Sequence, residues 1–300
     1  MRGSLVPLVT PFRQGVVDDA AFRDLIEWQI DSGSHGLVVT GTTGEPSALT
    51  LEERRHVIES AVATVRRRVP VVAATGTNNF AETVELTRFA RRVGADAALV
   101  VVPYYVRPGQ EGLYRYFRSI ADQVDLPMMI YNIPGRTAVN MEAATIARLA
   151  RDCRNIIGVK EANKDFEHVN RVLHLCGRGF LVYSGIELLC FPMLAVGGAG
   201  HVSATGNILP REVARLYDLT VAGRWEEARH LHYHLLPMND ALFLETNPVP
   251  VKTALGLMGR MDPEVRLPLA PMGEGSLAQL RSVMETYGLL PARPSQAAPV

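Results

Sequence analysis

A chain of 300 residues, 47% of them hydrophobic, can bury a large core, and parallel barrels of this length commonly form one domain. Its 31 basic residues balance its 31 acidic ones without a lysine and arginine cluster, so we expect a small-molecule partner and no nucleic acid. No apolar run reaches the roughly 20 residues of a membrane span and no signal-peptide pattern opens the chain, so we expect a cytoplasmic protein without a membrane partner.

Short segments rich in β-branched residues recur along the first two thirds of the chain and predict strands. They are residues 5–10, 36–40, 70–75, 97–102, 127–132, 156–160, 180–184 and 201–204. Segments with helical periodicity lie between them, at residues 19–31, 51–67, 80–92, 111–124, 141–151 and 166–175. Strands that alternate with helices form parallel sheets, and eight such units can close into a (β/α)8, or TIM, barrel.

A doubly wound open sheet is the competing α/β architecture. We prefer the barrel because polar residues recur at the strand ends and no Gly-x-Gly-x-x-Gly follows an early strand. The pattern then changes to helices only, at residues 210–222, 225–244, 250–258 and 275–287. We therefore predict a barrel over residues 1–208, a C-terminal helical appendage over 209–290 and a disordered tail over 291–300, which is rich in Pro, Ala and Ser.

The loops that follow the strands of a parallel barrel are the expected place for a site. Gly41-Thr42-Thr43-Gly44-Glu45 follows the second strand, and its hydroxyls can bind an oxyanion or relay a proton, although a plain turn fits equally. Pro103-Tyr104-Tyr105 follows the fourth strand, where aromatic packing is the alternative. Glycines such as Gly185 and Gly200 near the last two strands allow close approach of a ligand, or tight barrel packing.

The segment after the fifth strand pairs Tyr131 at the strand end with Arg136 in the loop. A phenol can act as an acid-base group and a guanidinium can hold a carboxylate, so both could serve one cavity. A solvated surface arginine is the alternative for Arg136.

Lys160 ends an apolar strand in a chain that has only three lysines. Poor hydration at a strand end favours the neutral amine, which can attack a carbonyl. A lysine whose head reaches water and pairs with Glu161 is the other interpretation. Cys153, Cys176 and Cys190 lack metal or redox spacing, so we expect free thiols and no metal site.

Together these motifs resemble the dihydrodipicolinate synthase and N-acetylneuraminate lyase superfamily of class I pyruvate aldolases. The motifs that carry the resemblance are Gly41-Thr42-Thr43-Gly44-Glu45, Pro103-Tyr104-Tyr105, Tyr131-Asn132-Ile133-Pro134, Gly158-Val159-Lys160-Glu161 and Asn247-Pro248-Val249-Pro250-Val251-Lys252. They occur in the family's order and cover the chain to about Leu290.

The resemblance implies a role for each matching residue. Lys160 would form a Schiff base with pyruvate, Tyr131 would move protons, and Thr42 would link Tyr131 to a Tyr105 that reaches in from a neighbouring subunit. This implies a homo-oligomer, a dimer or a tetramer of tight dimers. Thr43 and the backbone amides of Thr42 and Thr43 would hold the pyruvate carboxylate, with Gly185 and the Val202 carbonyl beside the substrate. The imine itself withdraws electrons, so we expect neither cofactor nor metal.

Within the superfamily, Arg136 resembles the synthase branch, where an arginine receives the carboxylate of aspartate semialdehyde. The expected activity is therefore that of a 4-hydroxy-tetrahydrodipicolinate synthase. Ile186 stands where a polar residue is usual and Ala138 where glycine is usual, which favours another pyruvate aldolase or hydratase-aldolase as the alternative. A barrel that senses a 2-oxo acid without catalysis is the alternative of a different class. Asn78, Glu82 and Tyr104 match the family's lysine-feedback pocket whereas Leu51 and Arg54 do not, so inhibition stays open.

Overall fold

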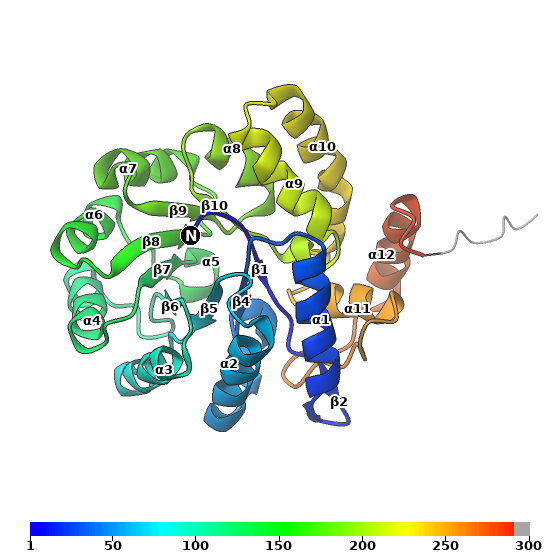
Figure 1. Cartoon of the computed structure of the whole chain (residues 1–300), viewed down its shortest axis with the longest axis horizontal. Helices are drawn as coiled ribbons and strands as arrows, with labels where there is room; N and C mark the ends of the chain where they lie inside the picture. Colours follow the sequence, from blue (N-terminus) through cyan, green and yellow to red (C-terminus); the bar gives the residue numbers. More distant parts are fainter. Residues whose placement is uncertain (291–300) are drawn as a thin grey trace, which may run out of the picture.

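The computed structural model describes residues 1–290 and contains a closed barrel of parallel strands (Figure 1). The barrel strands are β1 (Gly3–Pro7), β4 (Gly36–Val39), β5 (Val71–Ala74), β6 (Ala97–Val101), β7 (Met128–Asn132), β8 (Ile156–Glu161), β9 (Leu181–Ser184) and β10 (Gly200–Val202). β1 closes the barrel by pairing with both β4 and β10. The predicted (β/α)8 barrel is confirmed and the open sheet is excluded. The predicted tail, residues 291–300, lies outside the described residues.

Helices surround the barrel and continue past it at the C-terminal end (Figure 1). They are α1 (Asp19–Asp31), α2 (Leu51–Val65), α3 (Phe80–Val93), α4 (Gln110–Gln123), α6 (Ala143–Asp152), α7 (Phe166–Cys176), α8 (Cys190–Ala195), α9 (Pro210–Val221), α10 (Trp225–Ala241), α11 (Val249–Leu257) and α12 (Glu274–Thr286). The division at residue 208 stays a prediction, and α9 just beyond it packs against β1. Among residues 1–290, no helix is long and apolar enough to cross a membrane.

The first predicted strand, residues 5–10, begins and ends too late. Pairing runs from Gly3 to Pro7, whereas Leu8 and Val9 are buried without belonging to the strand. Burial, rather than strand pairing, explains the apolar character of these two residues. The sequence interpretation also missed short elements, which offer few residues for a periodic pattern. They are the hairpin of β2 (Phe12–Arg13) and β3 (Val16–Val17), the single-turn α5 (Pro134–Thr137), and α8.

The register between β7 and β8 places the candidate residues. Tyr131 pairs with Lys160, and Asn132 pairs with Glu161 one residue further on. Successive side chains of a strand point to opposite faces. Tyr131 belongs to the cluster inside the barrel, so Lys160 faces the interior beside it, while Glu161 faces the outer helices.

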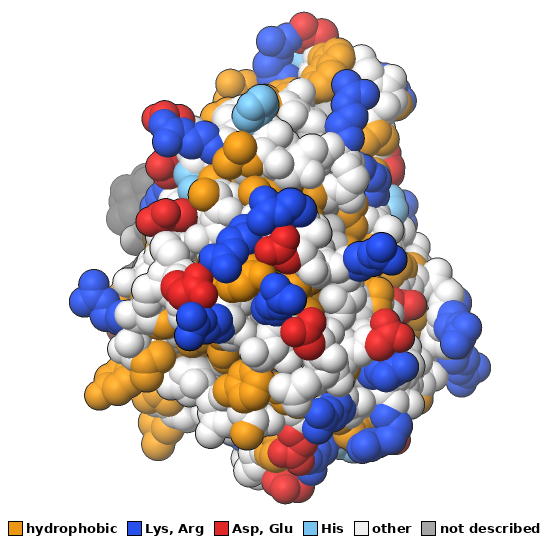
Figure 2. Space-filling view, turned by 90° about the vertical axis from the view of Figure 1, so that its left-hand side faces the viewer, with side chains coloured by type: hydrophobic (Ala, Val, Ile, Leu, Met, Phe, Trp, Pro, Cys, Tyr) orange, Lys and Arg blue, Asp and Glu red, His pale blue; other side chains and the backbone are white. Residues whose placement is uncertain are grey.

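The face shown in Figure 2 carries basic and acidic side chains interspersed rather than gathered by sign. Ion pairs between exposed side chains of opposite sign occur in the described chain, such as Arg148–Glu111 and Arg171–Glu167. This face therefore presents no continuous basic surface.

Candidate active site

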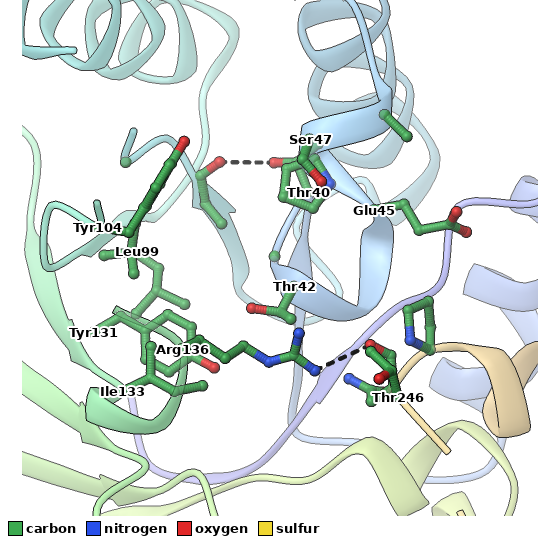
Figure 3. A pocket seen from close by; sticks show the side chains of 18 of the residues that line it. Thr40, Thr42, Glu45, Ser47, Leu99, Tyr104, Tyr131, Ile133, Arg136 and Thr246 are labelled. Atoms are coloured by element: carbon green, nitrogen blue, oxygen red, sulfur yellow. Dashed lines mark hydrogen bonds between the residues drawn. The ribbon is translucent and has the colours of Figure 1, made fainter. Parts of the chain in front are cut away.

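A cavity of about 420 Å³ opens at the carboxyl ends of the barrel strands (Figure 3). Its lining comes from the ends of β4 to β7 and the loops that follow them, and from two C-terminal segments around Asn247 and Pro268. The residues include Thr40, Gly41, Thr42, Glu45, Leu99, Val101, Tyr104, Tyr131, Ile133, Arg136, Thr246, Asn247, Arg266, Pro268 and Leu269. The C-terminal region thus supplies one wall of a cavity that the barrel alone leaves incomplete.

Lys160 lies against Tyr131 with little room around it. Its side chain is buried, with 6% of the residue exposed, and its Nζ lies 4.2 Å from the centroid of the Tyr131 ring. A Cβ added to Gly185 would lie 2.8 Å from Lys160 Cε. Within residues 1–290, Lys160 has no carboxylate at ion-pair distance, and Glu161 pairs with His168 on the outer side of the strand. The interpretation of Lys160 as an ion-paired surface lysine is therefore wrong.

Lys252 shows how differently a structural lysine is held. Its Nζ lies 2.6 Å from Glu45 Oε1, and both side chains are almost fully buried. Burial lowers the pKa of Lys252, while the nearby Glu45 carboxylate opposes the shift. The remaining lysine, Lys164, is exposed on the loop before α7. Of the three, Lys160 is the one that combines burial beside the cavity's tyrosine with an amine that has no ionic partner in the described part of the chain.

Tyr131, Thr42 and Arg136 all line the cavity (Figure 3). Tyr131 is 6% exposed and belongs both to the cluster inside the barrel and to the cavity lining. The Arg136 guanidinium reaches across the cavity, and its Nη2 donates to the Asn247 carbonyl at 3.2 Å (Figure 3). An arginine held by one hydrogen bond to a carbonyl keeps further N–H groups for a carboxylate.

Thr43 is buried behind Thr42, and its hydroxyl oxygen accepts a hydrogen bond from Asn247 Nδ2 at 3.0 Å. The hydroxyl proton of Thr43 is therefore available to donate to an anion. Val202, at the end of β10, belongs to the same inner cluster as Tyr131. The sequence motif that contains Asn247 indicates no role for this residue, whereas its contacts with Thr43 and Arg136 show that it supports the cavity.

Tyr105 does not join these residues within the single chain. It is 87% exposed, adopts φ +71°, and lies outside the cavity that its neighbour Tyr104 lines. The predicted link from Tyr131 through Thr42 to Tyr105 stays a prediction.

Two carboxyl groups are buried near this part of the barrel, Glu187, which interacts with the charge of Lys160, and Glu161, which lies on the outer side of β8. Burial raises the pKa of Glu187, while the N–H of Ala204, 2.8 Å from its Oε1, and the charge of Lys160 oppose the shift. Burial also raises the pKa of Glu161, and its hydrogen bond to His168 raises the pKa of that imidazole. Asn132 Nδ2 donates to both Glu161 oxygens, at 3.2 and 3.1 Å, which ties β7 to β8 behind Tyr131 and Lys160.

A (β/α)8 barrel with a buried lysine beside a tyrosine at its strand ends is the arrangement expected of a Schiff-base-forming lyase. The chain belongs to the dihydrodipicolinate synthetase family, whose model matches residues 1–287. It is 50% identical over 289 residues to the 4-hydroxy-tetrahydrodipicolinate synthase of Pelobacter propionicus, covering 96% of this chain and 99% of the relative.

Solved structures agree with this membership. Dihydrodipicolinate synthase from Aquifex aeolicus superposes with a TM-score of 0.95 at 44% identity, covering 96% of this chain and 99% of that chain. A chloride-inhibited dihydrodipicolinate synthase from Acinetobacter baumannii, complexed with pyruvate, gives a TM-score of 0.94 at 38% identity, with coverages of 96% and 99%.

Proposed function

We propose that this chain is a 4-hydroxy-tetrahydrodipicolinate synthase that condenses pyruvate with aspartate semialdehyde through a Schiff base on Lys160. The observation that carries the proposal is the buried Lys160 amine, packed on Tyr131 without an ionic partner among residues 1–290. The relatives' names and the pyruvate complex of a structural neighbour support it.

In the proposed reaction, Lys160 Nζ attacks the ketone carbon of pyruvate, and water leaves to form the imine. The protonated imine draws electrons from the neighbouring methyl group, which loses a proton and becomes a carbon nucleophile. Tyr131 would move these protons, and the packing of its ring against the lysine amine supports this role. No cofactor or metal is part of the proposal, because the imine nitrogen itself accepts the electron pair.

Two groups would hold the two substrate carboxylates. The Thr43 hydroxyl oxygen already accepts a hydrogen bond from Asn247, so its O–H would donate to the pyruvate carboxylate. The backbone amides of Thr42 and Thr43 would donate to the same carboxylate. Arg136, which lines the same cavity, would receive the carboxylate of the semialdehyde.

Another pyruvate aldolase is the second candidate, and Ile186 is the observation that favours it. This side chain is partly buried against the cluster inside the barrel, where a polar residue would suit a polar aldehyde better. If the chain is a synthase with a less polar pocket, Ile186→Asp should improve the semialdehyde reaction. A missing polar partner costs about 1–3 kcal/mol when the substrate group is buried unpaired.

The proposed assembly is a homo-oligomer in the cytoplasm, a dimer or a tetramer of tight dimers. The exposed Tyr105 supports it, since a phenol outside its own cavity can serve a neighbour's.

A coupled assay with pyruvate tests the proposal by comparing aspartate semialdehyde with aromatic and sugar-derived aldehydes. The synthase should turn over the semialdehyde fastest. If a less polar aldehyde reacted and the semialdehyde did not, the chain would instead be another pyruvate aldolase.

A further inference from the structure

A buried ion pair lies beneath the turn that would hold the pyruvate carboxylate. In this turn, Thr42–Gly44 form a single 3-10 turn, and Glu45 follows at φ +53°. The left-handed conformation is uncommon for a residue with a Cβ, and the Glu45 side chain is only 1% exposed. Both the backbone conformation and the buried charge must therefore be stabilised by neighbours.

Lys252 of α11 supplies the main stabilising contact. Its Nζ lies 2.6 Å from Glu45 Oε1 and 4.1 Å from the centroid of the Phe12 ring, and none of its side chain is exposed. The second carboxylate oxygen, Glu45 Oε2, accepts the backbone N–H of Arg266 at 3.1 Å. Both oxygens of Glu45 are thus held by the C-terminal region.

Further contacts fix the residues just before Glu45. Asn247, two residues before α11, donates to Thr43 Oγ1 at 3.0 Å, and Thr10 Oγ1 donates to the Gly44 carbonyl at 2.8 Å. Thr43, Gly44 and Glu45 are therefore each anchored, and the orientation of the Thr42 and Thr43 donors follows from these anchors.

We propose that Lys252 is a positioning residue for pyruvate, acting through Glu45 to keep the Thr42 and Thr43 donors aimed at the substrate carboxylate. The inference rests on the proposed function, which assigns those donors to pyruvate. A small misplacement of binding groups can cost about 100-fold in rate, so the shape of this turn matters beyond stability. If the ion pair only stabilised the fold, its loss would lower the melting temperature but leave pyruvate affinity unchanged.

The experiment measures the pyruvate concentration that half-saturates borohydride trapping at Lys160, which needs no aldehyde. Lys252→Met leaves Glu45 buried and unpaired, and should raise this concentration by about tenfold or more, with trapping at saturation changed much less. Glu45→Gln keeps a hydrogen-bonding side chain but leaves the Lys252 charge unpaired, so it should also raise this concentration. If Lys252→Met does not fold, Glu45→Gln serves as the test in its place. The double variant with both Lys252→Met and Glu45→Gln has no unpaired charge. Its half-saturating pyruvate concentration should therefore be lower than that of Lys252→Met alone.

Leu280→Ala is the matched control, because Leu280 is fully buried in α12 of the same C-terminal region and is absent from the cavity lining. It should lower the melting temperature and leave half-saturation as in the wild type. If folded Lys252→Met or Glu45→Gln reached half-saturation at the same pyruvate concentration as the wild type, this inference would be wrong while the proposed function would stand. A wild type without an adduct at Lys160 would refute the proposed function and this inference with it.

Discussion

Tyr131 packs its ring on Lys160 and presents its hydroxyl to the cavity, so Tyr131→Phe separates packing from proton transfer. We expect turnover to fall about 100- to 10,000-fold, the range of general acid-base groups, while pyruvate binding changes little. Steady-state turnover and single-turnover imine formation measure the two effects. Unchanged turnover would assign the proton transfer to another group.

Gly185 has no space for a side chain beside the lysine. An alanine Cβ would lie 2.8 Å from Lys160 Cε and 3.0 Å from the Ala162 Cβ, so Gly185→Ala should displace the amine and slow adduct formation. The rate of borohydride trapping with pyruvate measures this. Gly275→Ala is the control, because a Cβ there meets nothing within 4 Å, and equal rates in both variants would contradict the prediction.

Arg136 separates the two substrates. Arg136→Ala should severely damage the use of aspartate semialdehyde, because a guanidinium–carboxylate contact is charge-assisted and specific in geometry. Pyruvate imine formation should suffer less, since its carboxylate is assigned to Thr43 and the adjacent amides. The ratio of kcat/KM to trapping rate tests this, and an equal loss in both would remove Arg136 from the aldehyde's site.

At the scale of elements, β7, β8 and α7 are joined by one buried network. Glu161 lies 3.2 Å from the ring nitrogen Nε2 of His168 and accepts from Asn132 of β7, directly behind the reactive pair. His168→Gln should lower the free energy of unfolding by about 1–3 kcal/mol near pH 6, since a buried carboxyl loses a partner. The difference from the wild type should shrink at higher pH.

The sign follows from the pKa of each partner. The hydrogen bond to Glu161 raises the folded-state pKa of His168, and burial raises that of Glu161. A raised folded pKa stabilises the protein below the unfolded value, about 6.5 for histidine, and the contribution is lost as pH rises through the folded pKa. Denaturant unfolding across this range measures it. His56→Gln removes an exposed pair with Asp19 and should change the free energy of unfolding little. A loss of unfolding free energy in His168→Gln that grows with pH would contradict the assignment.

The elements themselves were largely predictable because their signals are local. Alternating strand and helix patterns predicted the barrel, and strand ends pointed to Lys160 and Tyr131, which the register brings together. The single-turn α5 escaped because four residues contain too little periodicity.

The C-terminal part of the site was not predictable in the same way. Asn247 meets Thr43 across 204 residues of sequence, and Lys252 meets Glu45 across 207. No local pattern encodes such contacts, since each residue alone fits a helix or its cap. The sequence showed that Lys252 is one of three lysines, but only the fold shows that it is fully buried.

At the scale of the whole molecule, the exposed Tyr105 makes a prediction about assembly. If each chain lends Tyr105 to its neighbour's cavity, a Lys160→Ala chain and a Tyr105→Phe chain should restore one complete site when paired. Random pairing of equal amounts makes half the dimers hybrids with one intact site each, so about one quarter of wild-type activity should return. Co-refolding the two inactive variants and assaying the mixture measures this.

The matched control is the mixture of Lys160→Ala with Tyr131→Phe. These two residues are neighbours in the register of a single chain, so every site of a hybrid lacks one of them and no activity should return. Recovery in the Tyr105 mixture alone would place that phenol in the partner's site, because only a residue supplied across the interface can be complemented. If neither mixture recovered activity, Tyr105 would not serve a neighbouring subunit's site. Within its own chain it is exposed and lies outside the cavity.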